Sequence, residues 1–147
     1  MNTRFVNNAV CHLFEEIRYE FNGIEIDRCK NVGLTTSMKS YVAYNFSQTV
    51  VLENAGSVDV GETATIADDA GNFDIFIPLR MILGFAEDYQ KIIINAKHEL
   101  VPLRSGSDLN AVIQTYAENN VLEGFKINLK IVEWLMHYVQ LSNEYKI

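Results

Sequence analysis

The stretch that decides the fold is "YEFNGIEID", residues 19–27. Apolar side chains occupy alternate positions on both sides of Asn22-Gly23: Ile17, Tyr19 and Phe21 before it, and Ile24 and Ile26 after it. A period of two places every second side chain on one face of a strand. Asn-Gly is the dipeptide that most readily adopts the two positive φ angles of a tight hairpin turn. The sequence therefore predicts a β-hairpin with one apolar face, which another part of the chain must cover.

The composition is typical of an ordered globular protein. The 147 residues are 48% hydrophobic and 21% charged, without a low-complexity tract. We expect one domain over residues 1–147, with a core that needs no covalent cross-link. The two cysteines, Cys11 and Cys29, do not form the close ligand pairs of a zinc site. Two free thiols in a reducing compartment are expected, with a disulfide as the alternative.

The charge of the chain argues against a nucleic-acid partner. Acidic residues outnumber basic ones by 19 to 12, which gives a net charge of −7, and the basic residues are scattered. Such a protein repels a phosphate backbone. No segment resembles a signal peptide, and no apolar stretch approaches the roughly 20 residues that span a bilayer. We therefore expect an intracellular protein with no membrane partner.

The first half of the chain gives mixed signals around the hairpin. Residues 7–16 combine helical spacing with the start of the strand alternation, so we expect a long strand, with a short helix as the alternative. Residues 31–48 predict a short helix that is capped by Thr35 or Thr36. Its apolar face would carry Met38, Tyr41 and Val42. Residues 57–72 predict a short strand and an exposed acidic loop.

The second half of the chain continues with strand signals around one helix. Alternation resumes at Phe73, and the apolar residues from Leu79 to Tyr89 follow Pro78 at helical spacing, which makes this the best predicted helix. Residues 91–105 predict a strand in which Pro102 indicates an edge or a bulge. A long connection with one turn of helix follows.

The last pattern, in residues 125–142, is a strict alternation that slips by one position at Val132, as an inserted bulge residue would cause. Six to eight short strands with turns between them predict a mainly β protein, an antiparallel sandwich with one or two short helices in the connections. The expected core residues are Tyr19, Phe21, Ile26, Ile75, Ile77, Ile93, Ile127, Leu129 and Trp134.

The sequence lacks the common catalytic motifs. It has no phosphate-binding glycine pattern, no GxSxG and no HExxH. A metal site would require several isolated residues to converge: His12, His98, His137 and Glu99. Single histidines in strands are more often core-edge or surface residues. We therefore predict no enzyme, no catalytic residue, no cofactor and no metal site.

Residues 68–74 carry oxygen ligands of the kind that calcium binds. Asp68, Asp69, Asn72 and Asp74 supply them, but their spacing differs from that of an EF-hand loop. Clustered Asp, Asn and Gly residues are also typical of turns. We expect a solvated turn in this region.

The order of the segments resembles a known family. Residues 7–27, 72–101 and 125–134 are similar to the first half of the double jelly-roll proteins related to the major capsid proteins of Polinton and adintovirus-type elements, and of large DNA viruses. The matching motifs are Asn22-Gly23, Ile26-Asp27, Ile77-Pro78-Leu79, Phe85 to Tyr89, and Trp134. The chain departs from the family pattern in two ways. The double barrel of the family needs a second jelly roll, and this sequence stops at about the position where that second half would begin. His137 stands where similarity suggests a proline.

The resemblance implies a jelly roll with a non-enzymatic role in structure or assembly. It also implies that the helix from Leu79 to Tyr89 docks on the side of the barrel and that the loop of residues 57–72 faces outward. The chain would be an incomplete or single-barrel version of the double jelly roll. It would then supply the capsid symmetry by association, either as a homo-oligomeric trimer or hexamer or with a second jelly-roll domain. Its location would be intracellular, or the virion if it belongs to an active element. The alternative is a domesticated jelly-roll module that binds a carbohydrate or a protein.

Overall fold

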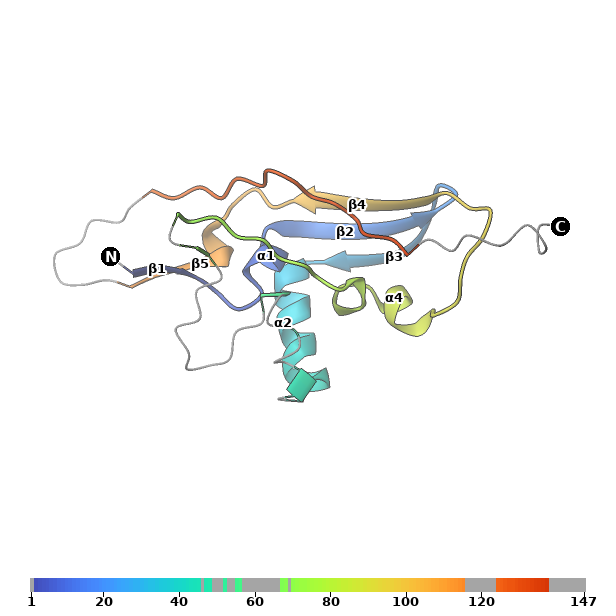
Figure 1. Ribbon diagram of the computed structural model, residues 1–147, viewed down its shortest axis with the longest axis horizontal. Coiled ribbons are helices and arrows are strands. Elements are labelled where there is room, and N and C mark those ends of the chain that lie inside the picture. Colours follow the sequence, from blue (N-terminus) through green and yellow to red (C-terminus); the bar gives the residue numbers. More distant parts are fainter. Residues whose placement is uncertain are drawn as a thin grey trace.

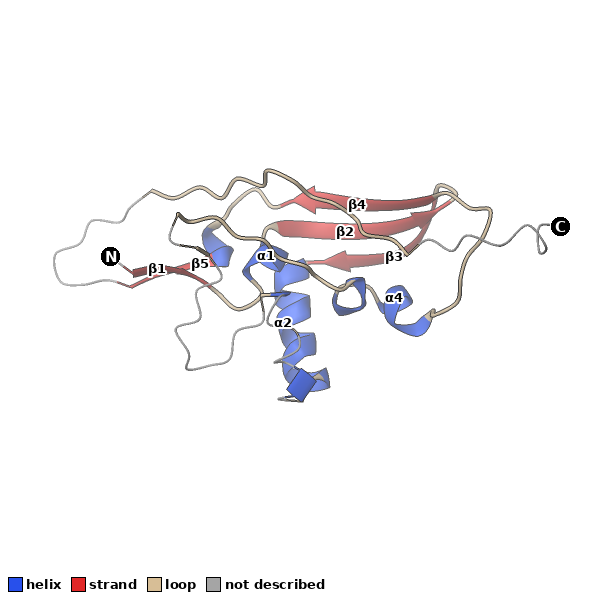
Figure 2. Ribbon diagram, viewed as in Figure 1, coloured by secondary structure: helices blue, strands red, loops and turns tan. Residues whose placement is uncertain are grey.

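Figure 1 shows the computed structural model, which describes residues 2–45, 47–48, 52, 55–56, 67–68, 70–115 and 124–137. Two antiparallel sheets and a few short helices make the fold mainly β, which confirms the jelly-roll sandwich class (Figure 2). The described strands are β1 (Asn2–Phe5), β2 (Phe14–Phe21), β3 (Ile24–Lys30), β4 (His98–Arg104) and β5 (Val112–Thr115). The helices are α1 (Ala9–His12), α2 (Val32–Ala43), α4 (Gly84–Asp88) and two 3-10 turns, η2 (Leu79–Met81) and η3 (Leu109–Ala111).

The predicted hairpin is confirmed as the centre of the larger sheet. This sheet has the strand order β3-β2-β4, and the smaller sheet pairs β1 with β5. The turn between β2 and β3 has positive φ angles at both central residues, 51° at Asn22 and 76° at Gly23. This is the conformation that Asn-Gly favours and that matches the twist of the two strands.

The predicted burial of Ile24 and Ile26 in this hairpin is wrong. Their side chains are 66% and 44% exposed. The register shifts within the hairpin, because Glu20 lies opposite Glu25 whereas Tyr19 lies opposite Asp27. An extra residue in one strand changes the phase of alternation. Asp27, and not Ile26, is therefore the neighbour of the buried Tyr19.

The segment before the hairpin contains the short helix that the sequence allowed as the alternative. The expected long strand over residues 7–16 is wrong, because α1 occupies Ala9–His12 and β2 begins at Phe14. Asn8 precedes α1 with a left-handed φ of 56°. Ala9 and Leu13 are buried at this end of the molecule. The helical spacing thus reflects a real helical turn that ends where the strand alternation starts.

Helix α2 forms as predicted, but with a different start and a different buried face. It begins at Val32, and the Thr36 hydroxyl donates a 2.7 Å hydrogen bond to the Val32 carbonyl inside the helix. Val32, Gly33 and Thr36 are buried, whereas the predicted apolar face is exposed. The small residues face α1, where Gly33 lies against His12. Close approach of two helices requires small side chains, and this requirement overrides the apolar pattern.

The predicted long helix over residues 79–89 is two short turns. Leu83 is extended, with a ψ of 127°, between η2 and α4. Met81 and Leu83 are both buried. In a continuous helix these two residues, which are two positions apart, would point in nearly opposite directions, and only one of them could face the core. The extended conformation of Leu83 buries both side chains, so tertiary packing overrides the helical spacing.

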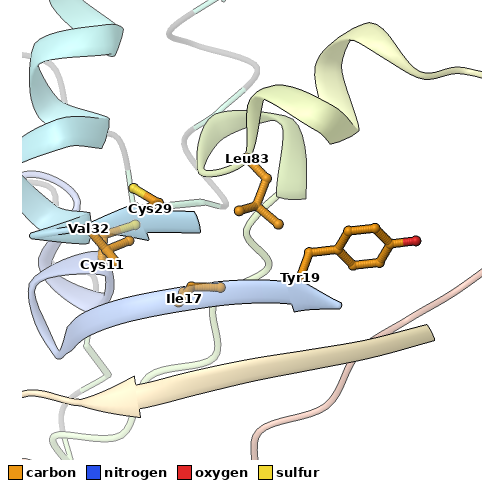
Figure 3. Packing of buried hydrophobic residues seen from close by; sticks show 6 residues of the cluster. All are labelled: Cys11, Ile17, Tyr19, Cys29, Val32 and Leu83. Atoms are coloured by element: carbon orange, nitrogen blue, oxygen red, sulfur yellow. The ribbon is translucent and has the colours of Figure 1, made fainter. Parts of the chain in front are cut away.

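The apolar face of the hairpin packs against this broken helix and against Trp134. Ile17, Tyr19 and Cys29 from the sheet form a buried cluster with Cys11, Val32 and Leu83 (Figure 3). Ile77, Leu79, Phe85 and Trp134 pack against the same cluster. A second cluster joins Ala9, Leu13 and Ala111 to Phe73, Ile127 and Leu129.

Two further segments behave as the alternation predicts. In residues 73–77 and 125–130, half-buried and exposed side chains alternate, although neither segment belongs to a ladder of the described strands. Among the expected core residues, Tyr19 is buried and Ile26 is exposed. The half-buried ones are Phe21, Ile75, Ile77, Ile93, Ile127, Leu129 and Trp134.

Strand β4 agrees with the expected edge position, but it begins at His98 and not at residue 91 as predicted, because residues 91–97 pair with no described strand. It pairs with β2, its other side pairs with no described strand, and the register shifts between Phe14 and Glu16. The predicted turn of helix in the following connection is η3, and β5 follows it as a strand that the sequence did not predict. The predicted strand and loop of residues 57–72 lie mostly outside the described residues. Within the described part of the chain, no helix has the length and apolarity to cross a membrane.

Candidate interaction surfaces

The residues considered for a metal site lie apart. His98 lies opposite Phe21 at one end of β2, whereas His12 precedes Phe14 at the other end. Among the described residues, no group of three or more His, Cys, Asp or Glu side chains is arranged to hold a metal ion. Burial lowers the pKa of His12 below its usual value. Glu99 forms an ion pair with Lys97 over 2.8 Å, and His137 is exposed.

The acidic segment considered for calcium is organised around Asp68. Its Oδ1 accepts hydrogen bonds from the backbone N–H groups of Ala70 and Asn72, over 3.0 and 2.7 Å. These bonds to Asn72 and Ala70 lower the pKa of the Asp68 carboxyl. Asn72 and Asp74 are exposed, and Asp69 lies outside the described residues. The side chain of Asp68 thus closes an exposed turn.

The two cysteines are free thiols inside the core. Burial raises the pKa of Cys11 to about 11 and also raises the pKa of Cys29. Thr36 interacts with Cys11, and this contact opposes the shift. A thiolate is the nucleophilic form of cysteine. Both groups are therefore held in the unreactive thiol form at neutral pH.

The outer face of the larger sheet carries a network of ion pairs. Arg28 lies between Glu16 and Glu25 and pairs with both, the first over 3.6 Å. Arg18 pairs with Glu16 over 3.2 Å and with Glu20 over 3.7 Å. The hydrogen bond from Arg28 lowers the pKa of Glu25. These side chains are half-buried or exposed, and charges that water still reaches stabilise a fold by at most about 1 kcal/mol per pair.

An aromatic cluster fills the end of the sheet near the hairpin turn. The Tyr19 hydroxyl and His98 Nδ1 are hydrogen-bonded over 2.7 Å. Phe85 stacks on Tyr19 with ring centroids 5.0 Å apart, Tyr89 stacks on Phe85 at 5.2 Å, and Trp134 meets Tyr19 edge-on at 6.4 Å. Burial raises the pKa of Tyr19. Tyr89 is the outermost member of the stack and is exposed.

This cluster joins the motifs on which the family resemblance rests. Asp27 Oδ2 accepts a 2.8 Å hydrogen bond from the backbone N–H of Phe85. The hairpin, α4 and Trp134 therefore meet at one place, although they are far apart in the sequence. Sequence reasoning missed the role of Asp27. Asp27 follows Glu25 in the polar phase of the alternation, so the sequence gives no signal for this role, which depends on the register shift in the hairpin.

The two outer edges of the larger sheet differ. On β4, Pro102 has no N–H group to offer to a further strand, and proline is a common way to protect an edge. On β3, α4 lies beside Asp27, but Ile24 and Ile26 near the turn are exposed. An exposed apolar edge strand is a template for pairing with another chain. The first half of β3 is therefore the open edge of this sheet.

Helix α2 presents a second apolar surface. Leu34, Met38, Tyr41 and Val42, which we call the α2 stripe, are 59%, 61%, 72% and 89% exposed. The sequence placed Met38, Tyr41 and Val42 on one face of a helix, and the structure shows that this face is exposed. The missed signal was the row of small residues Gly33, Thr36 and Ser40, which lies on the face toward α1 and Asn8.

Comparison with known proteins gives one match. A family model described as a double jelly roll-like domain matches residues 3–147. Comparisons with curated proteins and with solved structures find no match for the chain.

Proposed function

Because the chain belongs to the double jelly roll-like domain family, whose fold is of the capsid-like structural kind, we propose that it is a non-enzymatic structural protein that self-associates through its sheet edges and loops. Its partners are other copies of the chain, in a trimer or hexamer, or a second jelly-roll domain. Closed symmetric oligomers of this kind are the usual form of self-association. The proposed location is intracellular, or the virion where the protein belongs to an active element.

The open edge of β3 carries this proposal. Ile24 and Ile26 expose apolar side chains beside backbone groups that pair with no further described strand. An added strand would satisfy these groups and cover the side chains at the same time. The protection of the opposite edge by Pro102 limits association to one side of the sheet, as an ordered assembly requires.

The experiment is a mass measurement by light scattering after size exclusion, with negative-stain microscopy of the same fractions. We expect masses near three or six times 16.7 kDa. The variant Ile26→Lys places a charge on the open edge and should reduce the mass toward that of the monomer. Ile94→Lys is the matched control, because Ile94 is an exposed isoleucine outside the strands.

A wild-type protein that stays monomeric at high concentration, with edge amides already protected in hydrogen exchange, would contradict this proposal. It would favour the second candidate, a jelly-roll module that binds a carbohydrate or a protein. The observation that favours this second candidate is the aromatic stack, because its outermost ring, Tyr89, is exposed and could contact a ligand. Glycan-array binding that is lost in Tyr89→Ala would support this candidate.

A further inference from the structure

The α2 stripe is an apolar surface on a helix that points away from the body of the protein. Figure 1 shows α2 extending from the three-stranded sheet, with its first turns beside α1. Its packed residues, Val32, Gly33 and Thr36, belong to the first half of the helix. The stripe residues follow one another at i, i+4, i+7 and i+8, so they share one face. This spacing is the pattern with which a helix packs against another apolar element.

The charges around the α2 stripe favour an uncharged apolar partner. Lys39 is the only charged residue of α2. Its Nζ donates hydrogen bonds to the Arg80 carbonyl and to Glu87 Oε2, both over 2.6 Å, so its charge is neutralised within the chain. Two copies of this face can therefore meet without repulsion between like charges. A strongly charged partner would find no complementary charge on the helix.

The stripe is also nearly symmetric about its central residue. Leu34 lies four positions before Met38, and Val42 lies four positions after it. In an antiparallel pair of identical helices related by a two-fold axis, residue i contacts residue j and j contacts i. Such a pair would place Met38 against its own copy and Leu34 against Val42 of the second copy. The matching surface for this stripe is thus the stripe itself.

We propose that α2 packs antiparallel against α2 of a second copy of the chain, through a two-fold contact centred on Met38. This inference rests on the proposed self-association and specifies one of its contacts. The four residues expose roughly 500 Å² per copy, so the pair buries at most roughly 1,000 Å², below the 1,200 Å² of a typical stable interface. The contact is therefore weak alone and acts together with the sheet edge in a hexamer of dihedral symmetry, because a trimer has no two-fold axis.

Cross-linking tests the symmetry of this contact. The variant Met38→Cys should form disulfide-linked dimers when treated with a mild oxidant such as diamide, because the two introduced thiols meet at the axis. Leu109→Cys is the matched control, since Leu109 is an equally exposed apolar residue far from α2 in the sequence. Cys11 and Cys29 are buried in both variants and give the same background. Equal amounts of dimer in the two variants would overturn the proposal.

A second measurement tests the apolar character of the contact. Met38→Glu should weaken self-association about tenfold or more in sedimentation equilibrium, because each copy would bring a charge into an apolar contact. Leu109→Glu should leave the association unchanged. Since Met38 is exposed, circular dichroism and the melting temperature of Met38→Glu should match those of the wild type. Unchanged association in a folded Met38→Glu variant would overturn the proposal.

The outcomes separate this inference from the proposed function. If the oligomer persists in Met38→Glu but is lost in Ile26→Lys, the α2 contact is wrong and the structural role stands. If the wild type has the mass of a monomer yet Met38→Cys selectively cross-links, the α2 contact stands and the capsid-type assembly is wrong. If the wild type is monomeric and neither variant differs from its control, both are wrong.

Discussion

Gly33 shows how a single missing side chain determines the approach of two helices. A Cβ at this position would lie 2.2 Å from His12 Cγ and 2.7 Å from His12 Cα. Contacts this short do not occur between real Cβ atoms, and the second neighbour is backbone that cannot turn away. The α1 and α2 helices can therefore pack only because residue 33 is glycine. The same contact keeps the opposite face of α2 turned toward solvent.

Gly33→Ala should lower the free energy of unfolding by about 3 kcal/mol, at the upper end of overpacking effects. The intrinsic helix propensity predicts the opposite sign, since alanine is better than glycine by about 1 kcal/mol. Gly106→Ala is the control, because nothing lies within 4 Å of its Cβ position. Urea unfolding of the two variants measures both effects. Equal stability of the two variants would contradict the contact.

At the scale of elements, the hairpin and α4 are joined by one side chain. Asp27 lies in β3 opposite Tyr19, and its Oδ2 accepts the N–H of Phe85 in the first turn of α4. The first N–H groups of a helix lack partners within the helix. Asp27 accepts one of these N–H groups from a different element, in the way that an ordinary capping residue does from the position just before the helix. The bond positions Phe85 for stacking on Tyr19.

Asp27→Ala should therefore destabilise the protein by about 1 to 2 kcal/mol, the usual cost of a lost helix cap. Asp27→Asn keeps an acceptor oxygen without the charge and should lose less. Asp74→Ala, at an exposed aspartate, is the control. Thermal unfolding with near-ultraviolet circular dichroism would report both the stability and the environment of the aromatic cluster. A full effect from Asp27→Asn would assign the role to charge and not to capping.

At the scale of the whole molecule, the groups with shifted pKa values contribute to the response to acid. Burial lowers the pKa of His12 in the folded protein, whereas its pKa in the unfolded chain is near 6.5. Below about pH 6.5 the unfolded state therefore binds more protons than the folded state, and stability falls as the pH falls. Asp68 and Glu25 have lowered pKa values, so their contributions are lost only at more acidic pH.

Between pH 7 and pH 5, the free energy of unfolding should decrease in the wild type and decrease less in His12→Gln, which cannot be protonated. His137→Gln, at an exposed histidine, should follow the wild-type profile. Urea unfolding at several pH values measures the three profiles. If the profile of His12→Gln has the wild-type slope in this range, another group is responsible for the loss of stability.

Local chemistry explains most of what the sequence predicted correctly. The Asn22-Gly23 turn, the alternation of residues 73–77 and 125–130, and the edge position of Pro102 each depend on backbone conformations that neighbouring residues control. The family resemblance depends on the same motifs and agrees with the fold class.

The candidate surfaces were less predictable, because they depend on which side of each element is covered. The exposure of Ile26 follows from a register shift, and the exposure of Met38 follows from the close contact between Gly33 and His12. Neither arises from neighbours in the sequence. The sequence alone thus determined the local turns, the strand periodicity and the mainly β class, since these follow from short-range sterics and hydrophobic spacing. Only the tertiary structure decided the open edge of β3 and the outward α2 stripe, because burial is a property of segments that meet across long separations in the chain.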